Sequence, residues 1–412
     1  MISTIPGPDL ADFARARDVV AAVVRHTPME SSRFLADRLG VPVHLKCENL
    51  QRTGSYKLRG AFNRLSALSP EERARGVVAA SAGNHAQGVA FAARELGIRA
   101  TIFMPVGVAL PKLDATRAYG ADVVLHGDSV GETLEAANAF AVETGAVVIP
   151  PFDHADVIAG QGTLGLEVLD DVPDAATIVV PIGGGGLAAG VASAVKQRAA
   201  LEGRTIRVIG VQAENASPFV PSLAQGHAVQ VPVVPTIADG IAVYKPGELT
   251  LEIIRETVDE VITVSDDDIA RALLVLLERA KLVVEPAGAV SVAALMSGRI
   301  HSDGPVVALL SGGNIDPLLM QRVIAHGLAA SDRYLTLEIG LPDRPGQLAR
   351  IAELLAEANA NVIEVLHTRH GNGLQISEVA LRLSVETRGP AHRASVVDVL
   401  RRAGYEPRIV SE

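Results

Sequence analysis

Between about residue 40 and residue 325, short runs rich in valine and isoleucine alternate with alanine- and leucine-rich stretches of helical period. Several of these runs are apolar at every position, as expected of strands that a parallel sheet buries on both faces. The alternation therefore predicts an α/β fold, and the number of strands predicts two open parallel-sheet layers with a crevice between them. The predicted strands are residues 41–47, 76–81, 99–105, 121–126, 146–150, 176–182, 207–212, 260–264 and 305–311.

Two of the intervening helices have recognisable ends. The helix His85–Leu96 is closed by Gly97, a residue that readily adopts the left-handed conformation after a helix. The helix Asp266–Lys281 follows Ser265, which can cap it, and three aspartates in its first turn suit the positive end of the helix dipole.

The pattern changes after residue 331. A strand with Leu335, Leu337 and Ile339 on one face leads into a turn at residues 341–347. The remaining elements are a helix with one apolar stripe, two strands, a second helix and a short strand: the stripe Leu348, Ile351, Leu355 and Ala358, then residues 361–368, 379–385, about 391–402 and 407–410. This β-α-β-β-α-β order predicts a ferredoxin-like module with one solvated sheet face.

We therefore expect two domains, residues 1–330 and 331–412, the first with a smaller subdomain of about residues 57–152 inserted in it. Composition excludes several other classes. A net charge of −10 without a Lys/Arg-rich run argues against a nucleic-acid partner. No apolar run of about 18 residues and no signal-peptide pattern are present, so we expect no membrane span and a cytoplasmic protein.

The single cysteine, Cys47, excludes an intrachain disulfide and a cysteine-rich zinc site. We expect it to be a small buried apolar residue.

Four glycines, Gly183–Gly186, stand between a predicted strand and a predicted helix. Such a loop lets backbone N–H groups converge on an anion at the helix N-terminus, where the dipole favours negative charge. The phosphate of several ligands would fit. Residues 184–189 also match the dinucleotide pattern GxGxxA, with Glu214 at the end of the next strand, so a nicotinamide-dependent oxidoreductase is an alternative.

Three further clusters lie at strand ends or beside them. Lys57 stands among small residues in TGSYKLRGA, and a lysine combined with a phosphate loop is what a pyridoxal-phosphate (PLP) Schiff base needs. Residues 81–88, SAGNHAQG, offer N–H groups and side chains that suit a carboxylate. Residues 311–314, SGGN, follow the last apolar strand, and ligands of open α/β sheets bind at such carboxyl ends.

In this order and spacing, TGSYKLRGA, SAGNHAQG, GGGGL and SGGN resemble the fold-type-II (tryptophan-synthase-β-like) PLP enzymes. Within that family the chain resembles the threonine dehydratases, also called threonine ammonia-lyases, over about residues 5–325. The segment LPDRPGQL (341–348) resembles ACT domains, which bind small amino acids and regulate metabolic enzymes. Segments that add to the first likeness are residues 48–61, 151–163, 236–243 and 283–289.

The resemblance implies roles for individual residues. Lys57 would form the Schiff base with PLP and then act as the base at Cα of the substrate. Ser311 would hydrogen-bond the pyridine nitrogen, and Asn84 the ring hydroxyl. Glu285 and Gly240 would line the cofactor site without covalent work. The cofactor phosphate would be held by main-chain N–H groups of Gly183, Gly184, Gly185, Gly186 and Leu187, and the substrate carboxylate by Ser81, Ala82, Asn84 and His85.

The implied reaction is elimination of water and then ammonia from L-threonine, giving 2-oxobutanoate, with L-serine giving pyruvate. A hydroxyl at the ring nitrogen stabilises a protonated ring less than a carboxylate would, which suits elimination. The resemblance also implies regulation by an amino acid such as isoleucine or valine, and a homodimer or homotetramer. The role would be a first step toward isoleucine or the catabolism of threonine.

One departure separates this chain from the closely similar serine racemases, which carry a second serine at the position of Ala82. Alanine has no proton to supply to the opposite face of Cα, so a lyase is favoured. The racemase pattern also has acidic metal ligands after the strand that ends here in Glu214, but neutral residues follow this glutamate, so no metal is assigned. A 3-hydroxyaspartate ammonia-lyase and a non-catalytic amino-acid sensor remain alternatives.

Two groups of residues look like metal ligands by type alone. Asp153, His154 and Asp156 are interpreted as a loop, and His367 and His370 as solvated surface.

Overall fold

The computed structural model describes residues 5–232, 234–369 and 377–410. The chain divides into two compact units, residues 1–320 and 321–412, and helix α14 (Pro317–Ala330) spans the boundary. No helix of the described residues is long and apolar enough to cross a membrane.

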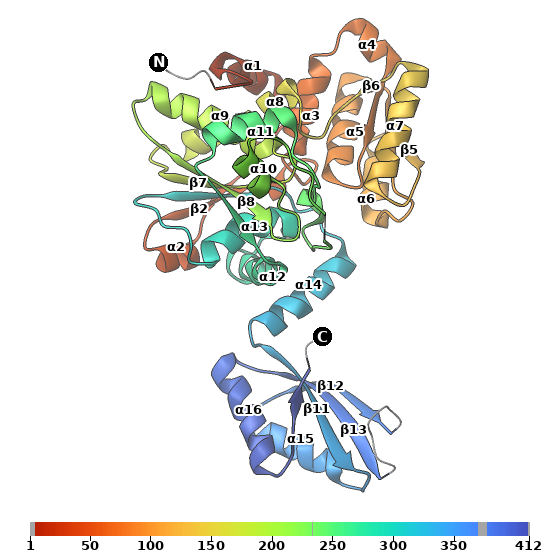
Figure 1. The fold of residues 1–412 in the computed structure, drawn as a ribbon, viewed down its shortest axis with the longest axis vertical. Helices are drawn as coiled ribbons and strands as arrows, with labels where there is room; N and C mark the ends of the chain where they lie inside the picture. The colour runs from red at the N-terminus through yellow and green to blue at the C-terminus, as the bar shows by residue number, and fades with distance from the viewer. Residues whose placement is uncertain (1–4, 233, 370–376, 411–412) are drawn as a thin grey trace. The chain divides into compact units, whose positions relative to one another are not determined.

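The first unit contains two sheets, which confirms the predicted α/β fold with parallel layers (Figure 1). In the larger sheet every neighbouring pair is parallel except the pair at the β1 edge, which is antiparallel. The short strand β1 was not predicted, because its three residues, MES, form no apolar run. In spatial order the strands are β1 (Met29–Ser31), β2 (Val43–Cys47), β10 (Val306–Leu310), β7 (Thr177–Pro181), β8 (Arg207–Ala213) and β9 (Glu260–Val264).

The smaller sheet is parallel throughout. Its strands, in spatial order, are β5 (Asp122–Leu125), β4 (Ala100–Met104), β3 (Val77–Ala80) and β6 (Val147–Val148). Alternate residues of β3 point to different cores: Val77 and Ala79 pack with α3 and α5, whereas Val78 packs with α7. The helices of this part are α3 (Lys57–Ser66), α4 (Pro70–Arg75), α5 (Asn84–Leu96), α6 (Leu110–Ala118) and α7 (Val130–Thr144).

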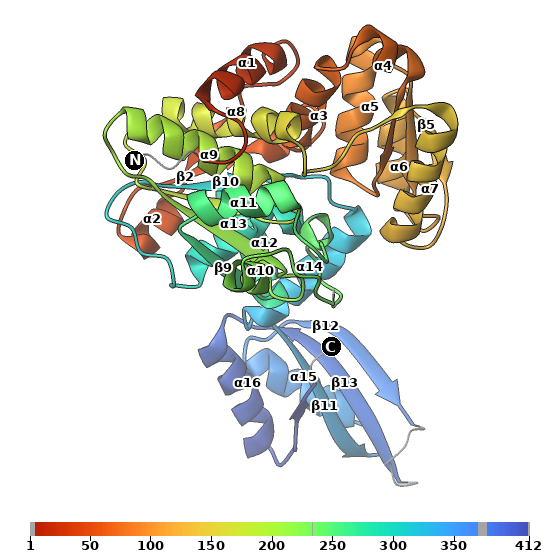
Figure 2. The ribbon, with the colours of Figure 1, turned by 45° about the horizontal axis from the view of Figure 1, so that its top comes forward.

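The larger sheet also carries helices on both faces (Figure 2). Ile178 and Val180 of β7 belong to one core with α8, α9 and α11, while α13 packs against the sheet from the other side together with α12. The helices are α1 (Leu10–Val20), α2 (Arg33–Leu39), α8 (Ala155–Asp171), α9 (Gly186–Leu201), α10 (Phe219–Gln225), α11 (Glu248–Thr257), α12 (Asp266–Val275) and α13 (Pro286–Met296). Short helical turns are η1 (Glu48–Leu50), η2 (Asp239–Ile241) and the π-helical η3 (Leu276–Ala280).

The predicted helix ends are partly correct. α5 begins at Asn84 and is closed by Gly97 with φ +66°. Ser265 caps α12 in a reciprocal arrangement with Asp268. The continuous helix predicted to Lys281 is wrong, because regular α-helix stops at Val275 and a π-helical turn follows before Lys281 reverses the chain at φ +61°.

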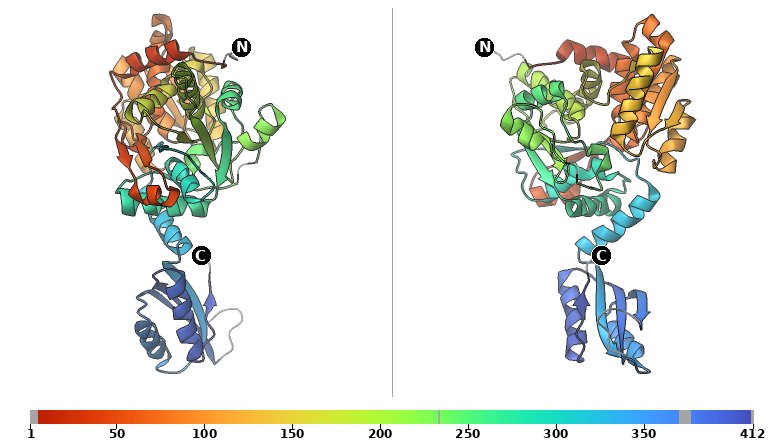
Figure 3. Two further views of the ribbon diagram at one scale, coloured as in Figure 1. Left: turned by 90° about the vertical axis from the view of Figure 1, so that its left-hand side faces the viewer. Right: turned by 45° about the vertical axis from the view of Figure 1, so that its right-hand side comes forward.

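The second unit has the predicted β-α-β-β-α-β order and a four-stranded antiparallel sheet, with α15 and α16 on one face (Figure 3). Leu335, Leu337 and Ile339 lie in the core against these helices, as predicted. The bounds are β11 (Tyr334–Pro342), α15 (Gln347–Glu357), β12 (Val362–Thr368), β13 (Glu378–Glu386), α16 (Pro390–Arg402) and β14 (Arg408–Ile409), in the sheet order β12-β13-β11-β14.

One detail predicted for this unit is wrong. Leu348 is exposed, because it lies in the first turn of α15, and Leu354 joins Ile351 and Leu355 in the core instead. The chain enters α15 through Gly346 at φ +89°, and no side chain caps this helix. His370 lies outside the described residues, and His367 is exposed on β12 as predicted.

Candidate active site

The predicted site segments of the first unit lie at the carboxyl ends of strands from both sheets. Residues 81–83 follow β3, the glycine loop follows β7, and Ser311 follows β10. Lys57 is the first residue of α3. The segment before it is fastened to the end of β10, because the backbone N–H of Tyr56 donates to the Ser311 carbonyl at 3.1 Å and Ser55 pairs with Gly312.

The Lys57 side chain is partly buried. Its Nζ donates to the Pro151 carbonyl at 2.9 Å and lies 5.3 Å from the centroid of the Tyr56 ring. Burial lowers the pKa of Lys57 to about 8, against the opposing attraction of the Glu285 carboxylate. An amine with this pKa is partly neutral near physiological pH, and only the neutral form is a nucleophile or a base.

His85 is neutral beside Lys57. Burial, and then the charge of Lys57, lower the pKa of His85 to about 3. The Ile149 carbonyl, 2.9 Å away, can only accept a hydrogen bond, so Nε2 carries the proton. This imidazole therefore adds no positive charge at the end of β3.

Asn84 and Glu285 meet at the N-termini of α5 and α13. Asn84 Nδ2 donates to Glu285 Oε1 at 2.6 Å, and Asn84 Oδ1 accepts from Asn314 Nδ2 at 2.8 Å. Burial, and then the negative charge of Asp239, raise the pKa of Glu285 to about 7. A side chain on Gly240 would approach this carboxyl group. Four residues from the predicted site segments therefore lie close together, namely Asn84, Gly240, Glu285 and Asn314.

The glycine loop is enclosed on several sides. A side chain on Gly184 would collide with the Phe152 ring, and one on Gly185 would collide with Phe219 and Thr250. Gly185, at φ +100°, is the residue before α9. The backbone N–H groups of residues 183–187 donate no hydrogen bond to any of the described residues. Backbone N–H groups without a partner, in and just before the first turn of a helix, suit an anion.

The segment that follows β3 is the one predicted to hold the substrate carboxylate. Ser81 Oγ accepts a hydrogen bond from the Gly83 N–H at 3.1 Å, so this hydroxyl oxygen already has one partner. Lys112 Nζ lies close to Gly83 and pairs with Asp239 at 2.9 Å. The Ser311 side chain is buried.

The residues that resemble metal ligands have structural contacts. The Asp153 carboxylate accepts the backbone N–H groups of Glu248 and Thr250, each at 3.1 Å. His154 caps α8 by accepting the Asp156 N–H at 3.1 Å. The described residues contain no group of three or more His, Cys, Asp or Glu side chains that could hold a metal ion. Cys47 is buried as predicted, and burial raises the pKa of its thiol.

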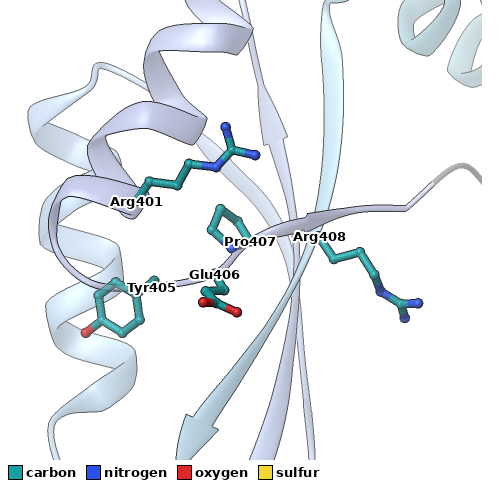
Figure 4. A pocket seen from close by; sticks show the side chains of 5 residues that line it. All are labelled: Arg401, Tyr405, Glu406, Pro407 and Arg408. Atoms are coloured by element: carbon teal, nitrogen blue, oxygen red, sulfur yellow. The ribbon is translucent and has the colours of Figure 1, made fainter.

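A hollow in the second unit involves none of the predicted site residues. It lies between the end of α16 and β14 (Figure 4). Arg408, one of its lining residues, forms an ion pair with Glu338 at 2.5 Å. The lining residues are Arg401, Tyr405, Glu406, Pro407 and Arg408.

Comparison with known proteins identifies the family of the first unit. The model of the family described as pyridoxal-phosphate dependent enzyme matches residues 20–312. The chain belongs to the pyridoxal-phosphate dependent enzymes. The ACT domain model matches residues 335–404, so this PLP enzyme carries a C-terminal ACT domain.

Similar proteins include an L-threonine ammonia-lyase from Geobacter sulfurreducens, 48% identical over 95% of this chain and 96% of that protein. Two solved structures also resemble this PLP enzyme. Threonine deaminase isoform 2 from Solanum lycopersicum is 38% identical, with a TM-score of 0.73 over 79% of this chain and 96% of the other. Maize serine racemase is 35% identical, with a TM-score of 0.72 over 78% and 98%.

The residues present fit PLP. The five N–H groups of the loop match a phosphate, and the glycines leave no side chain in its way. The buried hydroxyl of Ser55, two residues before Lys57, has no partner in the described residues and can serve a bound group. The sequence pattern did not identify Thr250 and Asp153 as supports of the loop, since both act through contacts between segments far apart in the chain.

Proposed function

We propose that this PLP enzyme is an ammonia-lyase that converts L-threonine to 2-oxobutanoate and ammonium, and L-serine to pyruvate. The observation that carries the proposal is the 48% identity to an L-threonine ammonia-lyase over nearly the whole of both chains, ACT domain included. The proposed residue roles are those that the resemblance implies.

In this proposal the Lys57 amine binds the cofactor covalently and then takes the proton from Cα of the substrate. Its pKa of about 8 leaves a useful fraction of neutral amine at neutral pH. When bound, the cofactor withdraws electron density from Cα and so acidifies its proton. The N–H groups of residues 183–187 hold the phosphate, and the N-terminal turn of α5 with Ser81 holds the substrate carboxylate.

The remaining groups keep the ring environment neutral. Ser311 offers a hydroxyl to the pyridine nitrogen, and Asn84 offers its remaining amide hydrogen to the ring hydroxyl. The Cβ–O bond of the substrate breaks as water leaves, and the released enamine hydrolyses to 2-oxobutanoate and ammonium. His85, which is neutral beside Lys57, would help to hold the substrate carboxylate without adding a positive charge.

Serine racemase is the second candidate, and the similarity to maize serine racemase favours it. Against it, Ala82 supplies no second proton donor where the racemases have serine. A 3-hydroxyaspartate ammonia-lyase needs a cation for the second carboxylate. Lys112, beside Gly83, is already paired with Asp239. Threonine, with its uncharged side chain, makes no such demand.

The test is a substrate panel with the full-length holoenzyme. L-Threonine, L-serine and 3-hydroxyaspartate are supplied, the 2-oxo acids are quantified, and D-serine is measured by chiral chromatography. We expect L-threonine to be the best substrate. D-Serine in excess of pyruvate would identify a racemase, and oxaloacetate as the main product would identify the 3-hydroxyaspartate enzyme.

Lys57→Ala is the matched variant for the same assay. We expect it to fold and to lose turnover by several orders of magnitude, because one residue is both nucleophile and base. The Schiff-base absorbance should also disappear. A Lys57→Ala enzyme that turned over threonine near the wild-type rate would exclude the proposed mechanism.

For the ACT domain we propose binding of a small amino acid, isoleucine or valine, and assembly into a homodimer or homotetramer. The support is the match over residues 335–404. The proposed role is the first step toward isoleucine or the degradation of threonine. Light scattering of the purified protein gives the assembly state, and a monomer at micromolar concentration would contradict it.

A further inference from the structure

The carbonyl of Gly184, in the middle of the glycine loop, is held from one side. Thr250 Oγ1 donates to it at 2.8 Å, and the Gly247 N–H lies 3.4 Å from it. The Thr250 hydroxyl has a second acceptor within reach, the Gly247 carbonyl at 3.1 Å. The contact with Gly184 is the shorter of the two and is fully buried.

This contact sets the direction of the next N–H group. The C=O of Gly184 and the N–H of Gly185 belong to one planar trans peptide, so they point in opposite directions. Because the carbonyl faces α11, the Gly185 N–H faces away from α11. It joins the other N–H groups of residues 183–187, which no described residue accepts.

A loop of glycines does not hold such an orientation alone. Glycine populates both signs of φ with similar ease, so the peptide between Gly184 and Gly185 has alternatives of low energy. Gly185 has φ +100°, and neither glycine has a side chain to restrict rotation. An external hydrogen bond to the Gly184 carbonyl is therefore what selects one orientation.

Thr250 is itself rigidly placed. Its side chain is fully buried, and its backbone N–H donates to Asp153 Oδ1 at 3.1 Å. The other Asp153 oxygen accepts the Glu248 N–H at 3.1 Å, so one carboxylate caps the first turn of α11. The adjacent residue, Phe152, packs directly on Gly184 and Gly186. The glycine loop thus lies between Thr250 on one side and Phe152 on the other, and Asp153, the neighbour of Phe152, binds Thr250.

We propose that Thr250 is a positioning residue for the cofactor phosphate: its hydroxyl holds the Gly184 carbonyl and thereby presents the Gly185 N–H to the phosphate. The inference rests on the proposed role of residues 183–187. It adds a residue outside the loop that tunes affinity for the phosphate group without touching it.

Thr250→Val is the informative variant, because valine keeps the branched shape and removes the hydroxyl. Thr250→Ser is the matched control, because serine keeps the hydroxyl. Each full-length protein is equilibrated by dialysis with PLP and, separately, with pyridoxal, which forms the same covalent bond to Lys57 but has no phosphate. Bound cofactor is quantified by absorbance, and the phosphorus NMR signal of bound PLP is recorded.

We expect Thr250→Val to lose PLP affinity about 10- to 100-fold, because the buried Gly184 carbonyl loses the shorter of its two hydrogen bonds and keeps only the Gly247 N–H at 3.4 Å. Its pyridoxal affinity should stay within about threefold of wild type, and Thr250→Ser should match wild type for both. The phosphorus signal should move only in Thr250→Val. Thr250→Ala, a second variant without the hydroxyl, should show the same selective loss and serves if Thr250→Val does not fold.

Unchanged PLP affinity in Thr250→Val would overturn the proposal, and so would equal losses for PLP and pyridoxal, which would indicate a general packing defect. A loss in Thr250→Ser as large as in Thr250→Val would also overturn it. Failure of the proposed reaction gives a different result: wild-type protein that binds PLP more tightly than pyridoxal but does not consume threonine.

Discussion

The orientation of one half-buried amide in the site, that of Asn314, is decided by a backbone carbonyl. Asn314 Nδ2 lies 2.8 Å from the Thr53 carbonyl, which can only accept, so the nitrogen must face it. The same nitrogen donates to Asn84 Oδ1 at 2.8 Å. Asn84 must therefore turn its own Nδ2 toward Glu285, and a donor remains available for the cofactor ring.

Asn314→Asp tests this chain of hydrogen bonds, because aspartate has nearly the same shape and no donor. The carboxylate oxygen that replaces Nδ2 would face both the Thr53 carbonyl and Asn84 Oδ1 without a hydrogen to donate, so the Asn84 amide should flip. We expect threonine turnover to fall at least about tenfold, as when hydrogen bonds of about 1.5–3 kcal/mol are lost. The absorbance maximum of the bound cofactor should shift. Kinetics and the absorbance spectrum of the holoenzyme check both.

Asn361→Asp, at an exposed asparagine of the second unit, is the control. It should change neither the rate nor the spectrum. An Asn314→Asp enzyme with the wild-type spectrum and rate would show that Asn84 is not oriented through Asn314.

At the level of elements, the helix that begins with Lys57 is anchored by a buried ionic network. Arg59, fully buried in α3, donates to both oxygens of Glu48 at 2.8 and 2.9 Å. It also donates to both oxygens of Glu167 in α8, at 2.6 and 2.9 Å. Lys46 of β2 pairs with Glu167 at 3.1 Å. The network therefore joins α3 to β2, η1 and α8.

Arg59→Met should destabilise the first unit by about 3–5 kcal/mol, because it leaves Glu48 buried without its cation. Arg94→Met, at an exposed ion pair, is the control and should cost no more than about 1 kcal/mol. Replacing Glu48 and Arg59 together by methionine should recover part of the loss. Chemical denaturation of the three variants checks this, and equal midpoints for Arg59→Met and wild type would contradict it.

The same network predicts a pH dependence. Arg59, followed by Thr27 and Lys46, outweighs the effect of burial and holds the pKa of Glu48 below its ordinary value of 4.5. Because the pKa of Glu48 is lower in the folded than in the unfolded protein, the stabilisation by its carboxylate is complete above pH 4.5. This stabilisation is lost as the pH falls through the pKa of Glu48 in the folded protein. The advantage of wild type over Arg59→Met should therefore be largest at neutral pH and shrink below about pH 4.5.

At the level of the whole molecule, the division into two units allows the functions proposed for each unit to be tested separately. A chain that ends at Ala330 should keep threonine turnover and lose any shift of the saturation curve by isoleucine or valine. Titration calorimetry of both amino acids into the full-length and the shortened protein measures the binding. No heat from either, with identical kinetics of the two proteins, would leave the second unit as a purely structural module.

If an effector binds, the coupling is reciprocal. Threonine must change the affinity of the effector by the same factor by which the effector changes the affinity of threonine, typically worth about 1–3 kcal/mol. Calorimetry of the effector with and without a substrate analogue that does not react measures that factor. Unequal factors would mean that the kinetic shift does not report binding.

The sequence alone predicted most of the strands and the family. Strands buried on both faces, such as β7 and β10, are recognised in the sequence as continuous apolar runs. Helix ends such as Ser265 and Gly97 depend on residues a few positions apart. The four short motifs of the first unit sufficed to place the chain among PLP enzymes. All of these signals are local, so one chain segment carries each of them.

The tertiary structure decided what holds the site in place. Thr250 and Gly184 are 66 positions apart, Arg59 and Glu167 are 108 apart, and Asn314 and Asn84 are 230 apart. Nothing in the periodicity of one segment encodes which side chain of a distant helix meets it. These contacts exist only after strands and helices pack, because burial removes water as the competing partner and leaves each polar group only its neighbours in the fold.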